Sequence, residues 1–106
     1  MAHKIVIYLP SQWGGEPIPC NIREKETKNC LLFITNLCGG ASEVDGVGIY
    51  KNSTKIEIEP ITIVYGFSRK NFQEKIPEVA KFCHDLRTNL QQDALAYEVD
   101  GTLYLV

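Results

Sequence analysis

The sequence lacks the features that mark membrane, secreted and metal-binding proteins. It has no apolar run near the roughly 20 residues that a membrane span needs. No charged leader with an apolar segment precedes the first strand-like run at Lys4. It has no Cys-x-x-Cys pair, and no histidine lies at a familiar zinc spacing from its 4 cysteines. We therefore expect a soluble, cytoplasmic protein with free, reduced thiols and no metal or cofactor.

An excess of charge of one sign is also missing. The chain has 11 Lys and Arg against 13 Asp and Glu, for a formal net charge of -2. Without a basic field, a long nucleic acid cannot be held by its phosphates. A small anionic ligand needs only one or two well-placed cations, so the global charge does not exclude it.

The length allows one core. With 106 residues, of which 44% are hydrophobic, the chain suits a single globular domain over residues 1–106, and too few residues remain for a second core. No internal repeat or low-complexity segment divides it. We expect one α+β domain.

Two segments show helical periodicity. In 71–90, apolar residues recur at three- and four-residue steps, which gives one apolar helix face: Phe72, Ile76, Val79, Phe82, Cys83, Leu86 and Leu90. Pro77 is expected in the first turn, where its missing N–H is tolerated. A first helix is predicted from about Lys25 to Leu37, ended by Gly39-Gly40. Cys30 and Cys83 fall on the two apolar faces, as small hydrophobic side chains.

Strand patterns occupy most of the remaining chain. The apolar run 4–9 predicts a central strand. The segments 44–51 and 55–67, separated by Asn52-Ser53-Thr54, predict a hairpin, in which Pro60 indicates a bulge or an edge. Asp100-Gly101 is a strong hairpin turn between strands at 93–99 and 102–106. The segment 11–21, which contains prolines and glycines, is expected to be a loop.

The resulting order, β-α-β-β-α-β-β, predicts a ferredoxin-like split βαβ sandwich with one added C-terminal strand. Both helices are expected on one face of an antiparallel sheet. The other face is then uncovered, and monomers seldom tolerate such an apolar surface. We therefore expect a homodimer or a larger symmetric assembly.

The candidate ligand-binding residues lie in a loop and at the two ends of the second helix. Trp13 could stack on a base, plug an interface or simply pack. Arg69 and Asn71 precede the helix, where free N–H groups favour a phosphate, although such charges are often only solvated. Arg87 and Gln91 lie one turn apart and could read a phosphate and a ribose or base edge, or could merely end the helix.

Catalytic groups are scarce. His84 and Asp85 are the only acid-base pair in view, but neighbouring residues point about 100° apart on a helix. Glu57 and Glu59 share a strand face, and we interpret them as edge charges that discourage aggregation. The chain shows no triad or nucleophile elbow. From the residues alone we expect a protein that is not an enzyme.

Several stretches together support a family resemblance: Phe33 with Gly39-Gly40, Gly46 with Gly48-Ile49-Tyr50, Glu59-Pro60-Ile61-Thr62-Ile63-Val64 and Gln92-Asp93-Ala94-Leu95-Ala96. Over roughly Leu31 to Val99, the chain resembles the phage anti-Thoeris proteins, within a broad group of small α+β proteins. The resemblance implies a sponge that holds a cyclic ADP-ribose-type signal of TIR-domain proteins between subunits without cleaving it. The arginine-bearing end of the second helix would carry the contacts.

Two other classes of function remain open. A small dimeric α+β-barrel enzyme of the monooxygenase or isomerase kind would use the uncovered sheet face as its cavity. Such a cavity needs inward polar groups at Tyr8, Tyr65 or Tyr97. A protein-interaction module would instead add a partner strand at its sheet edge.

Overall fold

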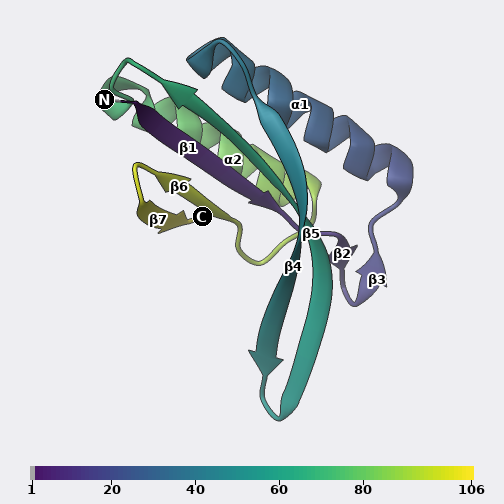
Figure 1. Ribbon diagram of the computed structural model, residues 1–106. Helices are drawn as coiled ribbons and strands as arrows, with labels where there is room; N and C mark the ends of the chain where they lie inside the picture. The colour runs from purple at the N-terminus through teal and green to yellow at the C-terminus, as the bar shows by residue number, and fades with distance from the viewer. Residues whose placement is uncertain (1) are drawn as a thin grey trace.

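The computed structural model describes residues 2–106, which form one α+β domain (Figure 1). In chain order the elements are β1 (His3–Leu9), β2 (Gln12–Trp13), β3 (Glu16–Pro17), α1 (Cys20–Cys38), β4 (Ser42–Asn52), β5 (Lys55–Ser68), the 3-10 turn η1 (Gln73–Lys75), α2 (Ile76–Asn89), β6 (Ala96–Val99) and β7 (Thr102–Leu105).

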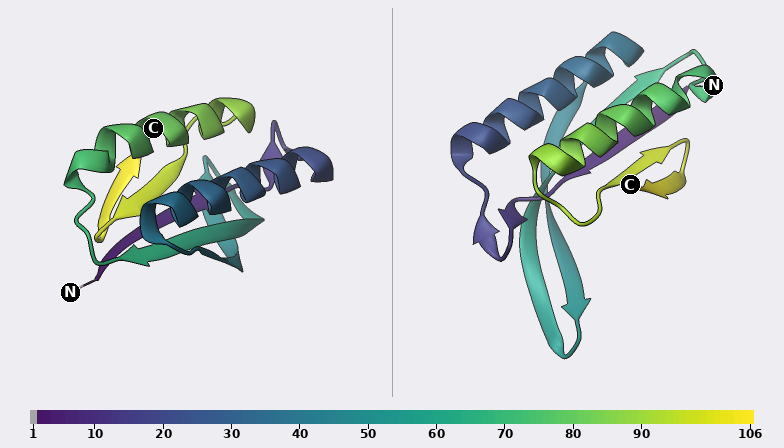
Figure 2. Two further views of the ribbon diagram at one scale, coloured as in Figure 1. Left: turned by 90° about the horizontal axis from the view of Figure 1, so that it is seen from above. Right: turned by 180° about the vertical axis from the view of Figure 1, so that it is seen from behind.

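Five strands form an antiparallel sheet in the order β4-β5-β1-β6-β7. The helices α1 and α2 lie side by side on one face of this sheet, as the two views in Figure 2 show. This arrangement confirms the predicted ferredoxin-like fold, with β7 as the added strand. The face without helices is called the open face below.

The hydrophobic core lies between the sheet and the two helices. Ile5, Ile7 and Leu9 of β1 are buried against Cys30 and Ile34 of α1 and against the apolar face of α2. Burying such aliphatic side chains contributes about 1.5 to 3 kcal/mol each. Cys30 and Cys83 are buried where the helical spacing predicts, and all four cysteines are free thiols.

The segment after β1 is more ordered than the loop that the sequence predicts. Gly14 and Gly15 adopt positive φ angles of 57° and 81° and close a short hairpin between β2 and β3. The helix α1 then begins at Cys20, five residues earlier than the apolar pattern indicates. Pro19 explains the early start, because it takes the N-cap position with φ -51° and needs no N–H partner there.

The second half of the chain differs from the prediction only at boundaries. Pro77 lies in the first turn of α2, as expected, but the helix begins at Ile76 after the separate turn η1. The last pair of strands begins at Ala96 rather than Asp93. These shifts are ordinary, since helix and strand ends carry the weakest periodic signal.

The hairpin formed by β4 and β5 projects well beyond the rest of the domain (Figure 1). β1 pairs with β5 only as far as Leu9 and Thr62, so the outer part of the hairpin has no third strand. Pro60 lies in this outer part, opposite Val47, and the pairing register continues through it without a bulge. Of the two predicted alternatives, the edge position is therefore correct.

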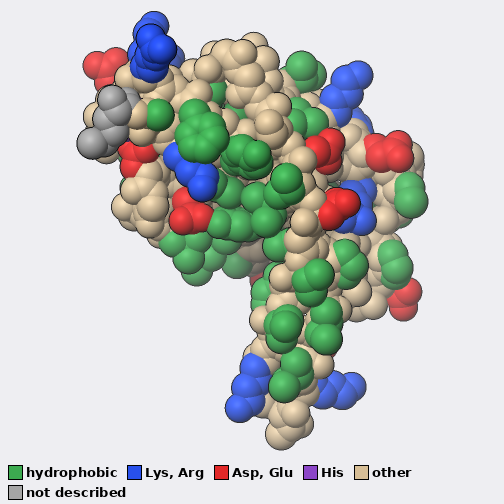
Figure 3. All heavy atoms as spheres, in the orientation of Figure 1, with side chains coloured by type: hydrophobic (Ala, Val, Ile, Leu, Met, Phe, Trp, Pro, Cys, Tyr) green, Lys and Arg blue, Asp and Glu red, His purple; other side chains and the backbone are tan. Residues whose placement is uncertain are grey.

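One face of the projecting hairpin is apolar and exposed. Val47, Ile49, Ile56 and Ile58, here called the apolar stripe, alternate with residues of the opposite face and are 66%, 68%, 72% and 65% exposed. Figure 3 shows hydrophobic side chains along the hairpin and over the adjoining open face. Exposed apolar patches of this kind usually mark contact surfaces.

The open face of the sheet also exposes large apolar side chains, among them Phe67, Leu103 and Leu105. Within residues 2–106, no helix is both long and apolar enough to cross a membrane.

Candidate functional site

A cavity of about 390 Å³ lies where the hairpin leaves the domain, at the end of β1. We call it the hairpin cavity. Its polar walls are Tyr8, Tyr50, Glu57, Glu59 and Gln92. Its remaining lining residues are apolar: Leu9, Pro10, Ile61, Ala94, Leu95, Ala96 and Leu105.

Strand alternation places the polar groups of the hairpin together. Tyr50 pairs with Glu57, and Gly48 pairs with Glu59, so these residues share the face opposite to the apolar stripe. Gly48 makes room for Tyr50, because a Cβ at Gly48 would lie 2.5 Å from the Tyr50 hydroxyl oxygen. The pKa of Tyr50 is raised by burial and then by the charge of Glu59.

Backbone groups at the end of β1 hold the Glu59 carboxylate. Its Oε1 accepts hydrogen bonds from the backbone N–H of Ser11 at 2.8 Å and of Gln12 at 3.0 Å, and a longer one from the Ser11 hydroxyl at 3.4 Å. Ser11 is itself buried. Hydrogen bonds to a carboxylate are stronger than neutral ones, so Glu59 has a fixed orientation at the cavity wall.

Tyr8 links the cavity to the open face. Its ring lines the hairpin cavity, and its hydroxyl donates a hydrogen bond to Glu98 Oε2 of β6. This hydrogen bond, together with burial and the charge of Glu98, raises the pKa of Tyr8 to about 12. The hydroxyl therefore stays protonated across the physiological pH range.

The electrostatic character of the hairpin cavity is acidic. Two carboxylates line it, and none of its lining residues within the described chain is Lys, Arg or His. A phosphate or pyrophosphate would meet like charge there without a compensating cation. A ligand that carries an ammonium or sulfonium group would be attracted, and the two tyrosine rings offer flat surface for an aromatic ring.

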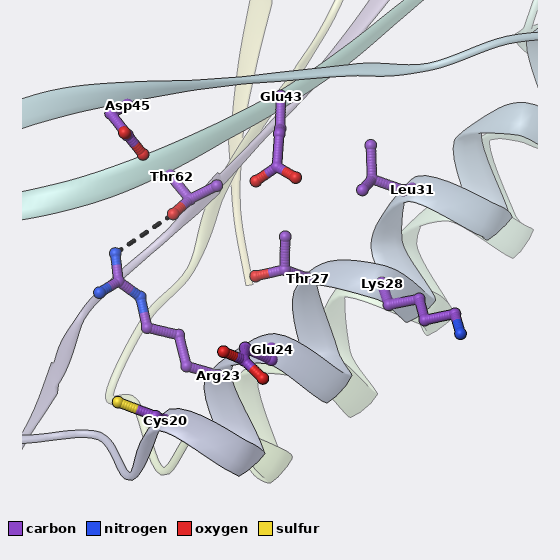
Figure 4. Close-up of a pocket in the computed structure, with 9 residues that line it drawn as sticks. All are labelled: Cys20, Arg23, Glu24, Thr27, Lys28, Leu31, Glu43, Asp45 and Thr62. Carbon is purple, nitrogen blue, oxygen red and sulfur yellow. Dashed lines mark hydrogen bonds between the residues drawn. The ribbon is translucent and has the colours of Figure 1, made fainter.

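A second hollow of about 500 Å³, the α1 cleft, separates α1 from β4 (Figure 4). The carboxylates of Glu43 and Asp45 point from β4 toward the helix, whereas Lys28 points away from them. The guanidinium of Arg23 reaches across and donates a hydrogen bond of 3.2 Å to the buried Thr62 hydroxyl. Arg23 and Lys28 line this cleft together with three carboxylates, those of Glu24, Glu43 and Asp45, so its lining is mixed in sign with an excess of one negative charge.

A third hollow, the helix-start cavity of about 480 Å³, lies beside the turn that precedes α2. Lys70, Asn71 and Lys75 line it together with Phe33 and Phe72. Asn71, a predicted ligand residue, is therefore at a cavity, although its side chain accepts a hydrogen bond of 2.8 Å from the backbone of Gln73. The predicted Arg69 is exposed and is not among the lining residues.

The other predicted ligand residues lie at the far end of α2. About 20 Å of helix separates Arg87 and Gln91 from Arg69 and Asn71, so one chain cannot bring the two pairs to a single small ligand. Arg87 contacts His84 Nε2 at 3.2 Å and the Asp93 carbonyl at 3.5 Å. Its Nε is buried without a hydrogen-bond partner.

Gln91 and Trp13 have structural roles in the chain. Gln91 adopts φ 52° just after α2, in the left-handed position that ends a helix. Trp13 is half-buried and packs against the core, which matches the packing alternative for this residue.

The weak acid-base pair is exposed on α2. His84 Nδ1 lies 3.8 Å from Asp85 Oδ1, and the pKa of Asp85 is lowered first by its hydrogen bond with Lys81. Neither residue lines a cavity described above. Within residues 2–106, no three His, Cys, Asp or Glu side chains gather as metal ligands would.

The residues of the hairpin cavity were mostly missed as candidates. The sequence interpretation treats Glu57 and Glu59 as edge charges and Tyr8 only as a test of an alternative. One sequence signal could have pointed to these residues. Ile56, Glu57, Ile58 and Glu59 alternate apolar and acidic side chains, which places both carboxylates on one face of the strand. Of the three tyrosines proposed for an enzyme cavity, Tyr8 and Tyr65 face the open side, and Tyr97 is buried in the core.

Comparison with known proteins identifies the fold. The chain is similar in fold to a phage SAM lyase. The structure of that lyase in complex with S-methyl-5'-thioadenosine superimposes with a TM-score of 0.73 at 15% sequence identity, covering 99% of this chain and 88% of the lyase chain. The apo state of a phage SAM lyase gives a TM-score of 0.75 at 16% identity, covering 98% of this chain and 87% of the lyase chain.

A more distant likeness joins the chain to a periplasmic divalent cation tolerance protein, CutA from Archaeoglobus fulgidus. The TM-score is 0.53 at 16% identity, covering 100% of this chain and 82% of that chain. No family model and no curated protein sequence matches the chain. These likenesses show the small α+β fold, and the anti-Thoeris resemblance stays a prediction.

Proposed function

We propose that this chain binds S-adenosylmethionine in the hairpin cavity and cleaves it, as a lyase, to S-methyl-5'-thioadenosine. The observation that carries the proposal is the acidic cavity without a cation, walled by Tyr8 and Tyr50. S-adenosylmethionine fits this chemistry because it combines an aromatic base with a sulfonium and an ammonium group. The similar fold of a phage SAM lyase supports the same ligand class.

The dimensions of the cavity agree with such a ligand. Its volume of about 390 Å³ lies within the usual range of about 300 to 1,000 Å³ for small-molecule sites. A tyrosine ring can stack on adenine, and the fixed carboxylate of Glu59 can accept a hydrogen bond from the ammonium group.

A lyase reaction of this kind needs no nucleophile from the protein. The carboxylate oxygen of the substrate attacks its own Cγ and forms the C–O bond of a homoserine lactone. The Cγ–S bond breaks, and its electron pair neutralises the sulfonium to give the thioether. No water, proton transfer or metal is needed for this balance, so the protein has only to fold the substrate into the reactive shape.

The distribution of charge assigns different roles to the two kinds of wall. The negative carboxylate and the positive sulfonium of the substrate both lose charge in the transition state, which an apolar surrounding favours. Leu9, Ile61 and Leu95 provide apolar walls of this kind. We therefore assign Glu59 to the ammonium group, whose charge does not change during the reaction. A carboxylate beside the sulfonium would stabilise the substrate more than the transition state and so slow the reaction.

A second candidate function is the sequestration that the anti-Thoeris resemblance implies. Lys70 and Lys75 line the helix-start cavity beside Phe33, together with the carboxylates of Glu74 and Glu78. Lys75 Nζ lies 3.6 Å from Glu78 Oε2, so Lys70 is the cation that favours an anionic ligand there. A cyclic ADP-ribose-type ligand would be bound there through its pyrophosphate and released unchanged. In that case the chain is not an enzyme.

One experiment separates the two candidates. The purified protein is incubated with S-adenosylmethionine and, separately, with cyclic ADP-ribose, and the products are identified by mass spectrometry after heat release. We expect S-methyl-5'-thioadenosine from the first incubation. Replacing the carboxylate in Glu59→Gln should lower kcat/KM about 10- to 150-fold, the range for a hydrogen bond to a charged group.

Glu43→Gln is the matched control, because Glu43 is a carboxylate of the α1 cleft on the other side of β4. It should leave turnover unchanged. Recovery of intact S-adenosylmethionine, together with cyclic ADP-ribose bound in a manner that Lys70→Ala weakens, would replace the lyase proposal with sequestration.

A further inference from the structure

We propose that Gln92 is a positioning residue, which holds the Glu59 carboxylate toward the ligand's ammonium group through the backbone of Gln12. This inference rests on the proposed function of the hairpin cavity. It assigns a role to a residue that the sequence singles out only within one of the stretches that carry the family resemblance.

The side-chain amide of Gln92 makes two hydrogen bonds. Its Nε2 donates to the Gln12 carbonyl at 2.7 Å and to the Leu90 carbonyl at 2.8 Å. Both hydrogens of the amide are therefore used, one toward the segment after β1 and one toward the end of α2. Gln92 also lines the hairpin cavity.

The backbone of Gln92 is fixed as well. Its N–H donates to the Arg87 carbonyl at 3.0 Å, across the left-handed residue Gln91. This bond spans five residues at the end of a helix and is the closing bond of a Schellman motif. The position of Gln92 is thereby set by α2, which is packed into the core through Leu86 and Leu90.

Gln12 passes this constraint to Glu59. Its carbonyl accepts from Gln92, and its N–H donates to Glu59 Oε1 at 3.0 Å beside the Ser11 N–H. The backbone of Gln12 is thus hydrogen-bonded to Gln92 on one side and to Glu59 on the other. A carboxylate on a hairpin that leaves the domain gains a fixed orientation relative to the helices, which a site on a projecting element otherwise lacks.

The test compares two ligands that are not cleaved and share the adenosine group. S-adenosylhomocysteine carries an ammonium and a carboxylate group, whereas S-methyl-5'-thioadenosine carries neither, so the effect of Glu59 is assigned from Glu59→Gln rather than from the two affinities alone. Their dissociation constants are measured by calorimetry for the parent, Gln92→Met, Glu59→Gln and the double variant. Methionine keeps the unbranched shape and removes the donor.

We expect Gln92→Met to raise the dissociation constant of S-adenosylhomocysteine by about two- to tenfold, the range for one hydrogen bond. The dissociation constant of S-methyl-5'-thioadenosine should stay unchanged. In the Glu59→Gln background, Gln92→Met should have no further effect, because its role runs through the carboxylate. Gln92→Asn keeps the amide on a shorter side chain and provides a second variant, with the same expected result, if Gln92→Met does not fold.

The alternatives give different results. Equal weakening of both ligands, or the same weakening in both backgrounds, would mean that Gln92 only supports the local fold, and the inference fails. If Glu59→Gln binds S-adenosylhomocysteine as tightly as the parent does, Glu59 holds no ammonium group and the inference also fails. If the parent binds neither, the proposed function fails with it.

Discussion

The hydroxyl of Tyr8 and the carboxylate of Glu98 join two strands that are 90 residues apart in the chain. The register of β1 and β6 places them diagonally on the open face, since Val6 pairs with Glu98 and Ile7 with Tyr97. Cross-strand pairs of this kind fix register and contribute roughly 0.2 to 1 kcal/mol. Their effect on ionisation can be measured directly.

Tyr8 should lose its proton only at strongly alkaline pH. Its pKa is raised from 10.0 to about 12, because the protonated hydroxyl donates to Glu98. The stabilisation from this bond is complete below pH 10 and is lost as the pH rises through about 12. Ultraviolet absorbance of tyrosinate during an alkaline titration measures the effect.

Glu98→Gln removes the charge and should move one tyrosine transition back toward the ordinary value. Glu16→Gln, a change at the exposed β2–β3 hairpin, serves as its control. An unchanged titration curve in Glu98→Gln would contradict the assigned hydrogen bond.

For single residues, the sequence predicts which side chains are buried but not which hydrogen-bond partners they have. Periodicity places Cys30 and Cys83 in the core, and the structure buries both. The burial of Cys83 raises its thiol pKa to about 12. The partner of Arg87 could not be predicted in the same way, because the Asp93 carbonyl belongs to the turn after α2, whose path has no periodic signal.

Among the elements, α1 and β5 approach each other closely at Gly66. A Cβ at this position would lie 2.6 Å from Ile34 Cγ2 and 2.9 Å from the Gly40 carbonyl oxygen. The second contact is with backbone, which cannot turn away as a side chain can. Glycine here allows the first helix to lie directly on the sheet.

Gly66→Ala should therefore lower the free energy of unfolding by about 1 to 3 kcal/mol, the usual cost of overpacking. Chemical denaturation followed by circular dichroism measures it. Gly40→Ala is the matched control: its added Cβ meets nothing within 4 Å and its φ is not positive, so its stability should stay close to that of the parent. Equal stability of the two variants would show that α1 does not pack as described.

Element order follows from the sequence here because each helix carries a single apolar face and every turn except the one after α2 carries glycine, proline or asparagine. The first residue of α1 does not follow from the sequence in the same way. Residues 20–24 contribute side chains to the α1 cleft, and only Ile22 extends the apolar pattern of the helix. The short β2–β3 pair is likewise too small to show alternation.

The whole molecule is elongated, with extents of 42 × 29 × 22 Å. Its radius of gyration is 13.8 Å, against about 13 Å for a compact chain of this length. The projecting hairpin accounts for the difference (Figure 1). Nothing else in residues 2–106 covers its apolar stripe, so this part of the chain leaves a hydrophobic surface in water.

We expect the chain to form a homodimer or a larger assembly through this hairpin. Ile49 and Ile58 are opposite each other in the register, and the double change Ile49→Asp, Ile58→Asp should shift the protein toward monomer. Light scattering coupled to gel filtration measures the mass of the assembly.

Leu32→Asp is the control, since Leu32 is 54% exposed on α1, away from the hairpin. It should assemble as the parent does. A parent that is monomeric at micromolar concentration would end this prediction.

The candidate site could not be predicted from the sequence because it is a property of the whole molecule. Tyr8, Tyr50, Glu59 and Gln92 meet only because the hairpin extends past β1 and α2 ends beside it. The sequence shows each of these residues in a plausible local role. The opposite error occurs at the two ends of α2. Arg69 and Arg87 are both predicted to bind one anionic ligand, but the length of the helix separates them.

The same two strands of the hairpin carry the apolar stripe on one face and the Glu57 and Glu59 carboxylates on the other, at alternating positions. Any partner that orders the stripe therefore also restricts the ligand-facing side chains. Thermodynamic reciprocity then requires that ligand tighten the assembly by the factor by which assembly tightens the ligand. Affinity would rise with protein concentration, so a dilute sample would understate how strongly the protein binds in a crowded cell.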